Sequence, residues 1–211
     1  MIREQTIARE QAALMRNYGR YPVEFVRGEG AWLYDPEGRG YLDCMSGISM
    51  INAGHCHPDV VAAIREQAGV LINTSNLYYT DPMIELAEWI RDTSMGGRVF
   101  FCNSGAEASE AAIKLARKHG GSERTEFVSL EDGFHGRTMG ALALTGQPGK
   151  QEAFRPLMPG ARYVPRNDGE ALRAAVSERT CAIAIEIVQG ECGVYPLDDD
   201  FVRLARELAD E

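Results

Sequence analysis

The chain has 211 residues, of which 45% are hydrophobic and 25% are charged, the composition of a globular protein. Its formal net charge of −9 argues against a nucleic-acid surface, because such surfaces need clustered Lys and Arg. No apolar run approaches the roughly 20 residues of a membrane span, and the charged N-terminus lacks a signal-peptide pattern. We therefore expect a cytoplasmic protein with no nucleic-acid or membrane partner.

The opening third predicts a polar helix over residues 2–17 and short strands over 23–27, 31–35 and 41–45. The turn Asp35-Pro36-Glu37-Gly38 joins two of these strands, since Pro presets φ and Gly tolerates positive φ. This part therefore indicates a small antiparallel unit. The turn His55-Cys56-His57 has metal-binding residue types, but a metal site needs about four ligands and no second cluster is visible, so we expect no metal.

The pattern changes after Gly54, where apolar strands and helices alternate. Helices are predicted over 58–71, 82–93, 109–119, 169–176 and 201–209, and strands over 98–102, 127–130 and 181–188. Continuous apolar strands that alternate with helices are typical of an α/β fold with a parallel sheet covered on both faces. The last helix runs to the final residue without a closing strand, so we expect this sheet to be incomplete.

Ligands of open α/β sheets bind outside the carboxyl ends of the strands. The strand over 98–102 is followed by Asn103-Ser104-Gly105-Ala106-Glu107-Ala108 and a helix. Free backbone N–H groups and the positive end of a helix favour phosphate binding here, and Gly105 lets an anion approach the backbone. The alternative is a tight turn capped by Ser104 with no ligand.

The next two strands are also followed by polar segments. Phe134, in the loop after 127–130, could lie flat against a planar ligand, and Arg137 could grip a carboxylate; the alternative is a surface loop. Glu186 lies in the apolar strand 181–188, where a carboxylate needs a partner, either a structural one or Arg137 as a switchable one. Polar groups after three consecutive strands favour a real site.

These segments, taken together, resemble class III aminotransferases, which are fold-type I enzymes that use pyridoxal 5′-phosphate (PLP), and within them the acetylornithine/ornithine branch. The resemblance rests on 103–117, Phe134-His135-Gly136-Arg137-Thr138, Thr145-Gly146-Gln147, Ser75-Asn76-Leu77-Tyr78-Tyr79, Gly54-His55-Cys56-His57-Pro58 and Tyr163-Val164-Pro165-Arg166-Asn167-Asp168. It covers the whole chain. It implies an aspartate aminotransferase-type, mostly parallel large-domain sheet with a small N-terminal α+β segment.

The resemblance also implies domains, an activity and partners. Residues 1–55 would be the N-terminal segment of the small domain, and residues 56–211 part of the PLP-binding large domain. The activity would move an amino group between N-acetylornithine, or a related ω-amino substrate, and 2-oxoglutarate in arginine biosynthesis. The complete enzyme would be a homodimer.

The resemblance assigns roles to individual residues. The cofactor-binding set is Ser104, Gly105, Ala106, Phe134 and His135, with the PLP phosphate on Gly105 and Ala106 and the ring on Phe134. The substrate-binding set is Arg137, Glu186, Glu191 and, near the substrate side chain, Tyr18. The family usually reads Glu-Pro-Ile-Gln-Gly-Glu-Gly-Gly around Glu191, and here Ile187 and Cys192 replace the proline and a glycine. We expect these departures to shift the local backbone.

PLP chemistry needs a lysine amine for the Schiff base. The chain has only Lys114, Lys118 and Lys150, and none of them matches the family's lysine motif. We therefore predict no catalytic residue in this chain and no activity for it alone. Three interpretations remain: the N-terminal part of a truncated aminotransferase, which we favour; half of a split enzyme completed by a second chain; and a non-catalytic binding module.

Overall fold

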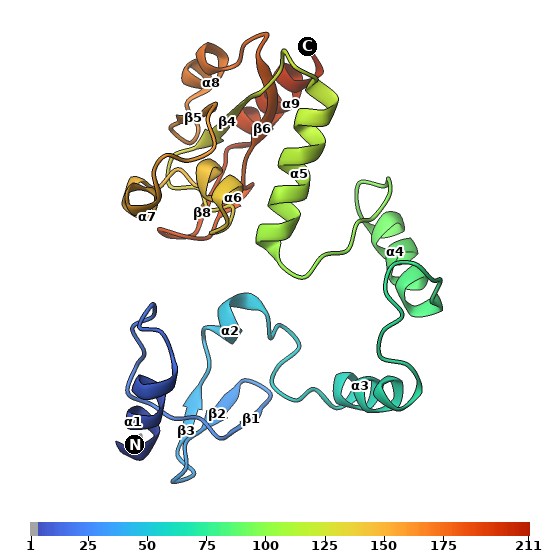
Figure 1. Cartoon of the computed structure of the whole chain (residues 1–211), viewed down its shortest axis with the longest axis vertical. Helices are drawn as coiled ribbons and strands as arrows, with labels where there is room; N and C mark the ends of the chain where they lie inside the picture. Colours follow the sequence, from blue (N-terminus) through green and yellow to red (C-terminus); the bar gives the residue numbers. More distant parts are fainter. Residues whose placement is uncertain (1–3) are drawn as a thin grey trace. The chain divides into compact units, whose positions relative to one another are not determined.

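The computed structural model describes residues 4–211, which divide into two compact units, residues 4–89 and residues 90–211. We call these the first and the second unit (Figure 1). The division falls within helix α4 (Asp81–Thr93). The boundary after residue 55, inferred from the family resemblance, stays a prediction.

The first unit contains a three-stranded antiparallel sheet in the order β1-β2-β3 and three helices before α4. Its elements are α1 (Glu4–Ala13), β1 (Arg27–Glu29), β2 (Trp32–Tyr34), β3 (Gly40–Leu42), α2 (Ser46–Ser49) and α3 (Pro58–Val70). The predicted antiparallel unit is confirmed. The helix predicted over 2–17 ends at Ala13, and residues 2–3 lie outside the described residues.

The second unit is built on a parallel sheet in the order β5-β4-β6. Its strands and helices are α5 (Gly105–Gly120), β4 (Glu126–Leu130), α6 (Met139–Leu144), α7 (Pro148–Gln151), the 3₁₀ turn η1 (Glu152–Phe154), β5 (Ala161–Val164), α8 (Gly169–Ala175), β6 (Thr180–Ala184), β7 (Val188–Gln189), β8 (Tyr195–Pro196) and α9 (Asp199–Asp210). The predicted α/β arrangement with a parallel sheet is confirmed.

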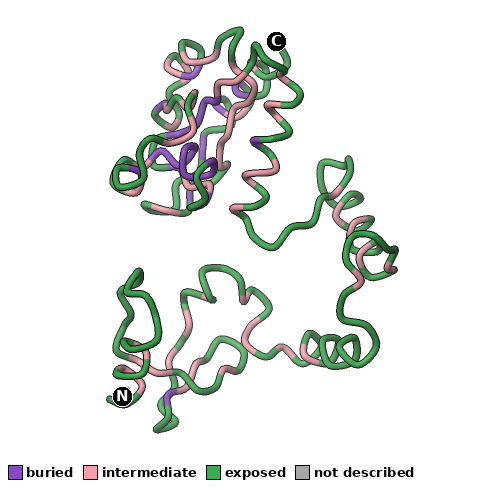
Figure 2. The backbone as a smooth tube through the Cα atoms, in the orientation of Figure 1, coloured by how far each residue is buried: buried purple, intermediate pink, exposed green. Residues whose placement is uncertain are grey.

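The central strand β4 explains why both faces of this sheet are covered. Because side chains alternate along a strand, Val128 and Leu130 face one side and Phe127 the other. The first two pack in a cluster with α8 and α9, through Leu172 and Phe201 among others. Phe127 instead packs with residues of α5 and α6. Buried backbone is concentrated in β4 and α6 (Figure 2).

The strand predicted over 98–102 is wrong. No residue in that segment pairs with another strand in the described part of the chain, and Phe100 is 69% exposed. An apolar segment becomes a strand only where a neighbour accepts its backbone hydrogen bonds, and none is present for this one among residues 4–211. Helix α6 and strand β5, which lie between the second and third predicted strands, were not predicted from the sequence.

No helix among the described residues combines the length and the apolar character needed to cross a lipid bilayer.

Candidate functional site

The N-terminus of α5 presents backbone donors. Ser104 is the N-cap, in extended conformation, and its Oγ accepts a hydrogen bond from the N–H of Glu107 at 3.2 Å. The Glu107 carboxylate turns back and accepts a hydrogen bond from the N–H of Asn103, the residue before the N-cap, at 2.5 Å. The N–H groups of Gly105 and Ala106 have no protein acceptor among the described residues, and a Cβ at Gly105 would meet open space. These free donors suit an anion.

The loop after β4 lies against this first helical turn. Ser109 Oγ donates to the carbonyl of His135 at 2.7 Å. Gly136 has φ +130°, and a Cβ there would come within 2.9 Å of the Ala106 Cβ, so only glycine allows this approach. Phe134 and Arg137 flank this contact in sequence. The structure thus brings the predicted phosphate and ring segments together.

Glu110 joins α5 to the start of α6. Its Oε1 accepts hydrogen bonds from Thr138 Oγ1 at 2.6 Å and from the N–H groups of Gly140 and Ala141 at 2.9 and 3.1 Å. The bond from Thr138 and these backbone bonds lower the pKa of Glu110, against the opposing effect of burial. The carboxylate therefore fixes the far end of the loop that carries Arg137.

His135 is held inside the site by two further contacts. Its N–H donates to Thr145 Oγ1 at 3.0 Å, and its Nε2 lies 3.3 Å from Ser129 Oγ on β4. Burial lowers the pKa of His135, while the charge of Glu186 raises it, and the net direction is downward. The imidazole is therefore neutral at pH 7 and acts here as a hydrogen-bonding group.

Glu186 lies two residues beyond the end of β6, so its predicted place inside the strand is wrong. Its Oε2 accepts a hydrogen bond from the N–H of Phe134 at 2.8 Å. The structure records no ion pair between Glu186 and Arg137 in the described chain. The Arg137 guanidinium instead lies 5.9 Å from the centroid of the Phe134 ring. Glu186 thus orients the backbone of the residue that carries the ring.

Glu191 forms an ion pair with Lys150 of α7, a lysine to which the sequence assigned no role in the site. The Lys150 Nζ also lies 5.1 Å from the centroid of the Phe134 ring. Burial raises the pKa of Glu191, but the hydrogen bond from Lys150 and the positive charges of Lys150 and Arg137 outweigh it, and the pKa is lowered. Glu191 is therefore a carboxylate at neutral pH.

The turn that carries Glu191 is fixed by the buried side chain of Gln189. Its Nε2 donates a hydrogen bond to the carbonyl of Glu131, at the end of β4, at 2.9 Å. Its Oε1 accepts a hydrogen bond from Arg166, which follows β5, at 3.0 Å. The Arg166 guanidinium also stacks 3.9 Å from the ring of Tyr195. Segments that follow three strands are thereby joined at one edge of the sheet.

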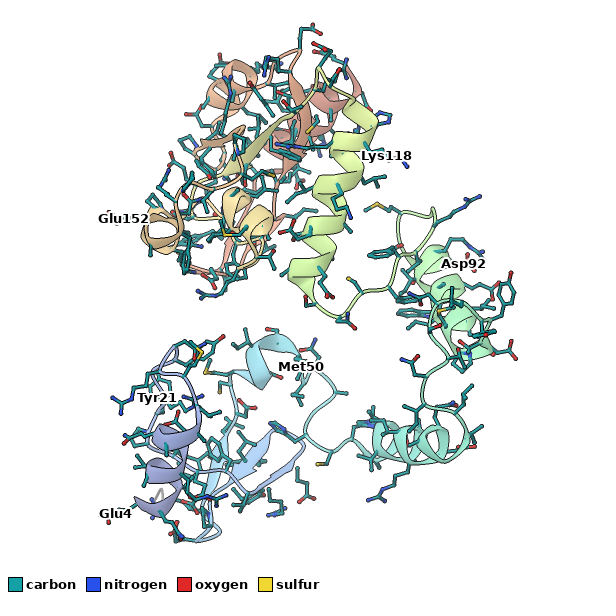
Figure 3. All side chains as sticks on the ribbon, in the orientation of Figure 1. Glu4, Tyr21, Met50, Asp92, Lys118 and Glu152 are labelled. Carbon is teal, nitrogen blue, oxygen red and sulfur yellow. The ribbon has the colours of Figure 1, made fainter. Side chains whose placement is uncertain are left out.

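Tyr18 belongs to the first unit, where it is 65% exposed. With Tyr21, labelled in Figure 3, it lines a hollow between α1 and residues 18–25. Its assignment to the substrate site stays a prediction.

The residues of the second unit fit a phosphorylated aromatic cofactor. Two free N–H groups begin a 16-residue helix, which suits a phosphate. Phe134 offers a ring face in the adjoining loop, and Arg137 is a cation able to bind a carboxylate in two hydrogen bonds. All of these groups belong to one unit with its own core.

A family model, aminotransferase class-III, matches residues 13–211. The chain therefore belongs to the class III aminotransferase family, whose cofactor is pyridoxal 5′-phosphate.

Two curated relatives, both named acetylornithine aminotransferase, show how similar this chain is to known members. It is 49% identical to that of Methanocaldococcus jannaschii, covering 100% of this chain and 54% of the relative. It is 50% identical to that of Gloeobacter violaceus, covering 94% and 50%. The chain spans about half the length of the curated relatives it matches.

Solved structures show the same relation. A structure of the ornithine aminotransferase of Toxoplasma gondii superposes with a TM-score of 0.91 at 29% identity, over 98% of this chain and 50% of that one. That structure, crystallised in the presence of oxidised glutathione, reveals partial occupancy of PLP at its active site. The acetylornithine aminotransferase of Elizabethkingia anophelis gives a TM-score of 0.80 at 31% identity over 98% and 50%.

Proposed function

We propose that this chain provides the N-terminal part of a PLP-dependent aminotransferase that moves an amino group between N-acetylornithine, or a related ω-amino substrate, and 2-oxoglutarate, and that acts as a homodimer. The observation that carries the proposal is the pair of free N–H groups at Gly105 and Ala106, beside the loop that bears Phe134. The names of relatives 44–50% identical to the chain support N-acetylornithine as the amino donor.

Each residue of this site then has a physical task. PLP, when bound, supplies the electron sink for amino transfer. Gly105 and Ala106 bind its phosphate, Ser104 shapes their helical turn, and the Phe134 ring covers the pyridine face. Glu186 and the neutral His135 hold the Phe134 loop in place. Arg137 binds a substrate carboxylate, and Glu191 and Tyr18 border the substrate.

The lysines bear on whether the chain acts alone. Lys114 and Lys118 are exposed on α5, and Lys150 is held by Glu191. We therefore expect the chain by itself to show no transaminase activity and no borohydride-reducible PLP adduct at a specific lysine. Mass spectrometry after reduction with borohydride checks this. A stoichiometric adduct on Lys150 would contradict it.

Two substitutions at one position test the phosphate site. Gly105→Pro removes one of the two free N–H groups, and proline fits there because it is tolerated in a first helical turn and Ser104 already has ψ 160°. Gly105→Ala keeps the N–H and adds a methyl group to open space. We expect the proline variant to bind PLP at least about tenfold more weakly, the effect of losing one hydrogen bond to a charged group.

The alanine variant is the matched control and should stay within about threefold of the wild type. Affinity is measured by equilibrium dialysis of PLP, with helix content checked by circular dichroism. If both variants bind PLP as the unchanged chain does, the phosphate does not lie on the N-terminus of α5, and the proposed site is wrong.

A further inference from the structure

Lys150, Glu191 and Gln147 form a cluster beside the Phe134 ring, and we call it the Lys150 cluster. Lys150 is the third residue of α7, which lies next to the labelled Glu152 in Figure 3. Gln147 donates to the carbonyl of Gly133 at 3.0 Å and to Glu191 Oε2 at 3.4 Å. The cluster therefore ties the Glu191 turn to the backbone just before Phe134.

The Lys150–Glu191 pair differs from an ordinary surface ion pair in its surroundings. The two side chains are 26% and 38% exposed, so water screens them only in part. The ammonium also lies 5.1 Å from the Phe134 ring centroid, within the range of a cation–π contact. A lysine held by a carboxylate and an aromatic face at once is fixed in position, whereas an isolated surface lysine samples many rotamers.

The charges around this ring explain what that fixed lysine does. Two cations, Lys150 and Arg137, lie within 6 Å of the centroid of the Phe134 ring. The positive charges of both lower the pKa of Glu191. Without Lys150, Glu191 would lose its ion-pair partner next to the place proposed for an anionic, phosphorylated ring. A free carboxylate there would repel that ligand and would move away from its present position.

We propose that Lys150 is a positioning residue of the site, which holds the Glu191 carboxylate beside the Phe134 ring and neutralises it there for an anionic aromatic ligand. This inference rests on the proposed PLP site. It gives Lys150 a role through Glu191 and not as a Schiff-base amine.

The first test is a double-mutant cycle on PLP binding by the 211-residue chain. We expect Lys150→Met to weaken PLP binding about tenfold, and Lys150→Arg, which keeps the positive charge, to change it less than about threefold. In the Glu191→Gln background, the Lys150→Met change should have a much smaller effect, because no carboxylate is left to neutralise. Lys118→Met, at the exposed lysine labelled on α5 in Figure 3, is the matched control and should leave binding unchanged.

The second test needs no cofactor. Carbon-detected NMR follows the titration of the Glu191 carboxyl group, whose pKa should rise in Lys150→Met and stay low in Lys150→Arg and Lys118→Met. If neither the unchanged chain nor any variant binds PLP, the proposed function is wrong. The Glu191 titration then still tests whether Lys150 holds Glu191 as an ion-pair partner. If PLP binds but the cycle is additive and the Glu191 titration is unmoved, the Lys150 inference is overturned. Loss of binding in both Lys150→Arg and Lys150→Met, at unchanged Glu191 titration, overturns it as well.

Discussion

The two units differ sharply in how much they bury. In the described part of the first unit, Asp35 is the one residue classed as buried, and it is polar. The second unit has apolar clusters on both faces of its sheet, around Leu172 on one side and Phe127 on the other. Apolar burial is the main force that fixes a fold. The groups proposed to bind PLP all stand on the unit that has such a core.

The first unit relies instead on hydrogen bonds between side chains and nearby parts of the chain. Asp35 Oδ1 accepts from the N–H groups of Glu37 and Arg39 at 3.1 and 2.8 Å, and its Oδ2 accepts from Tyr41 at 3.1 Å. His55 bonds Asp43 at 2.7 Å. Such contacts define turns and registers, yet each stabilises the fold far less than a buried apolar cluster does. We therefore expect the second unit to dominate the stability of the chain.

The largest effect expected from this contrast is that of Leu172→Ala. Leu172 is fully buried between β4 and α9, so truncation should cost about 2–5 kcal/mol of the free energy of unfolding. Leu42→Ala, at a leucine 59% exposed in the first unit, should cost less than about 0.5 kcal/mol. Urea denaturation followed by circular dichroism measures both. Equal losses would show that the first unit has a core of comparable weight.

Within the second unit, a substitution at Arg137 should lower activity without lowering stability. This arginine is exposed, so Arg137→Ala should leave the free energy of unfolding nearly unchanged. In a complete or complemented enzyme it should lower kcat/KM about 100-fold, through loss of a bidentate contact to a carboxylate, and change PLP affinity less than about threefold. Steady-state kinetics and PLP titration check the two parts. Equal losses in both would argue against the carboxylate role.

Glu110 makes the stability of the second unit depend on pH. Its pKa is lower in the folded chain than the ordinary 4.5, so the carboxylate stabilises the fold above pH 4.5 and this stabilisation is lost as the pH falls through the folded value. Glu110→Gln should cost about 1 kcal/mol at pH 7, and the difference should shrink below pH 4.5. Urea denaturation at a series of pH values tests this. A constant difference at every pH would exclude the charge as its source.

The fold was predictable where the pattern was local. The apolar run from Phe127 to Leu130 identified β4, and amphipathic spacing identified α5 and α9. Helix α6 was missed because five consecutive residues of it, 140–144, are all buried and so show no helical period. Strand β5 was missed because it is short and Arg162 is exposed. The segment over 98–102 misled the prediction because strand pairing is set by distant residues.

The site was predictable in its segments and not in its internal contacts. Ser104 and Gly105 could be singled out because they begin a helix in a recognisable motif, and Phe134 because it follows β4 in another. Lys150 and Gln147 were missed because their partner Glu191 is 41 and 44 residues away in sequence, and no local pattern encodes such pairs. Glu186 was found, but its hydrogen bond to a backbone N–H 52 residues away was not.

The smallest expected effect concerns Cys192, which stands where the family usually has glycine. Its φ of +63° is in the left-handed region that a side chain disfavours, and Gly193 follows with φ +123°. Cys192→Gly removes this strain but adds freedom to the unfolded chain, so we expect a gain of less than about 1 kcal/mol in the free energy of unfolding. Cys44→Gly, at an exposed cysteine that is not among the residues with positive φ, should lose stability instead. Thermal unfolding of the two variants compares them, and a loss at both positions would mean that the backbone at Cys192 is not strained.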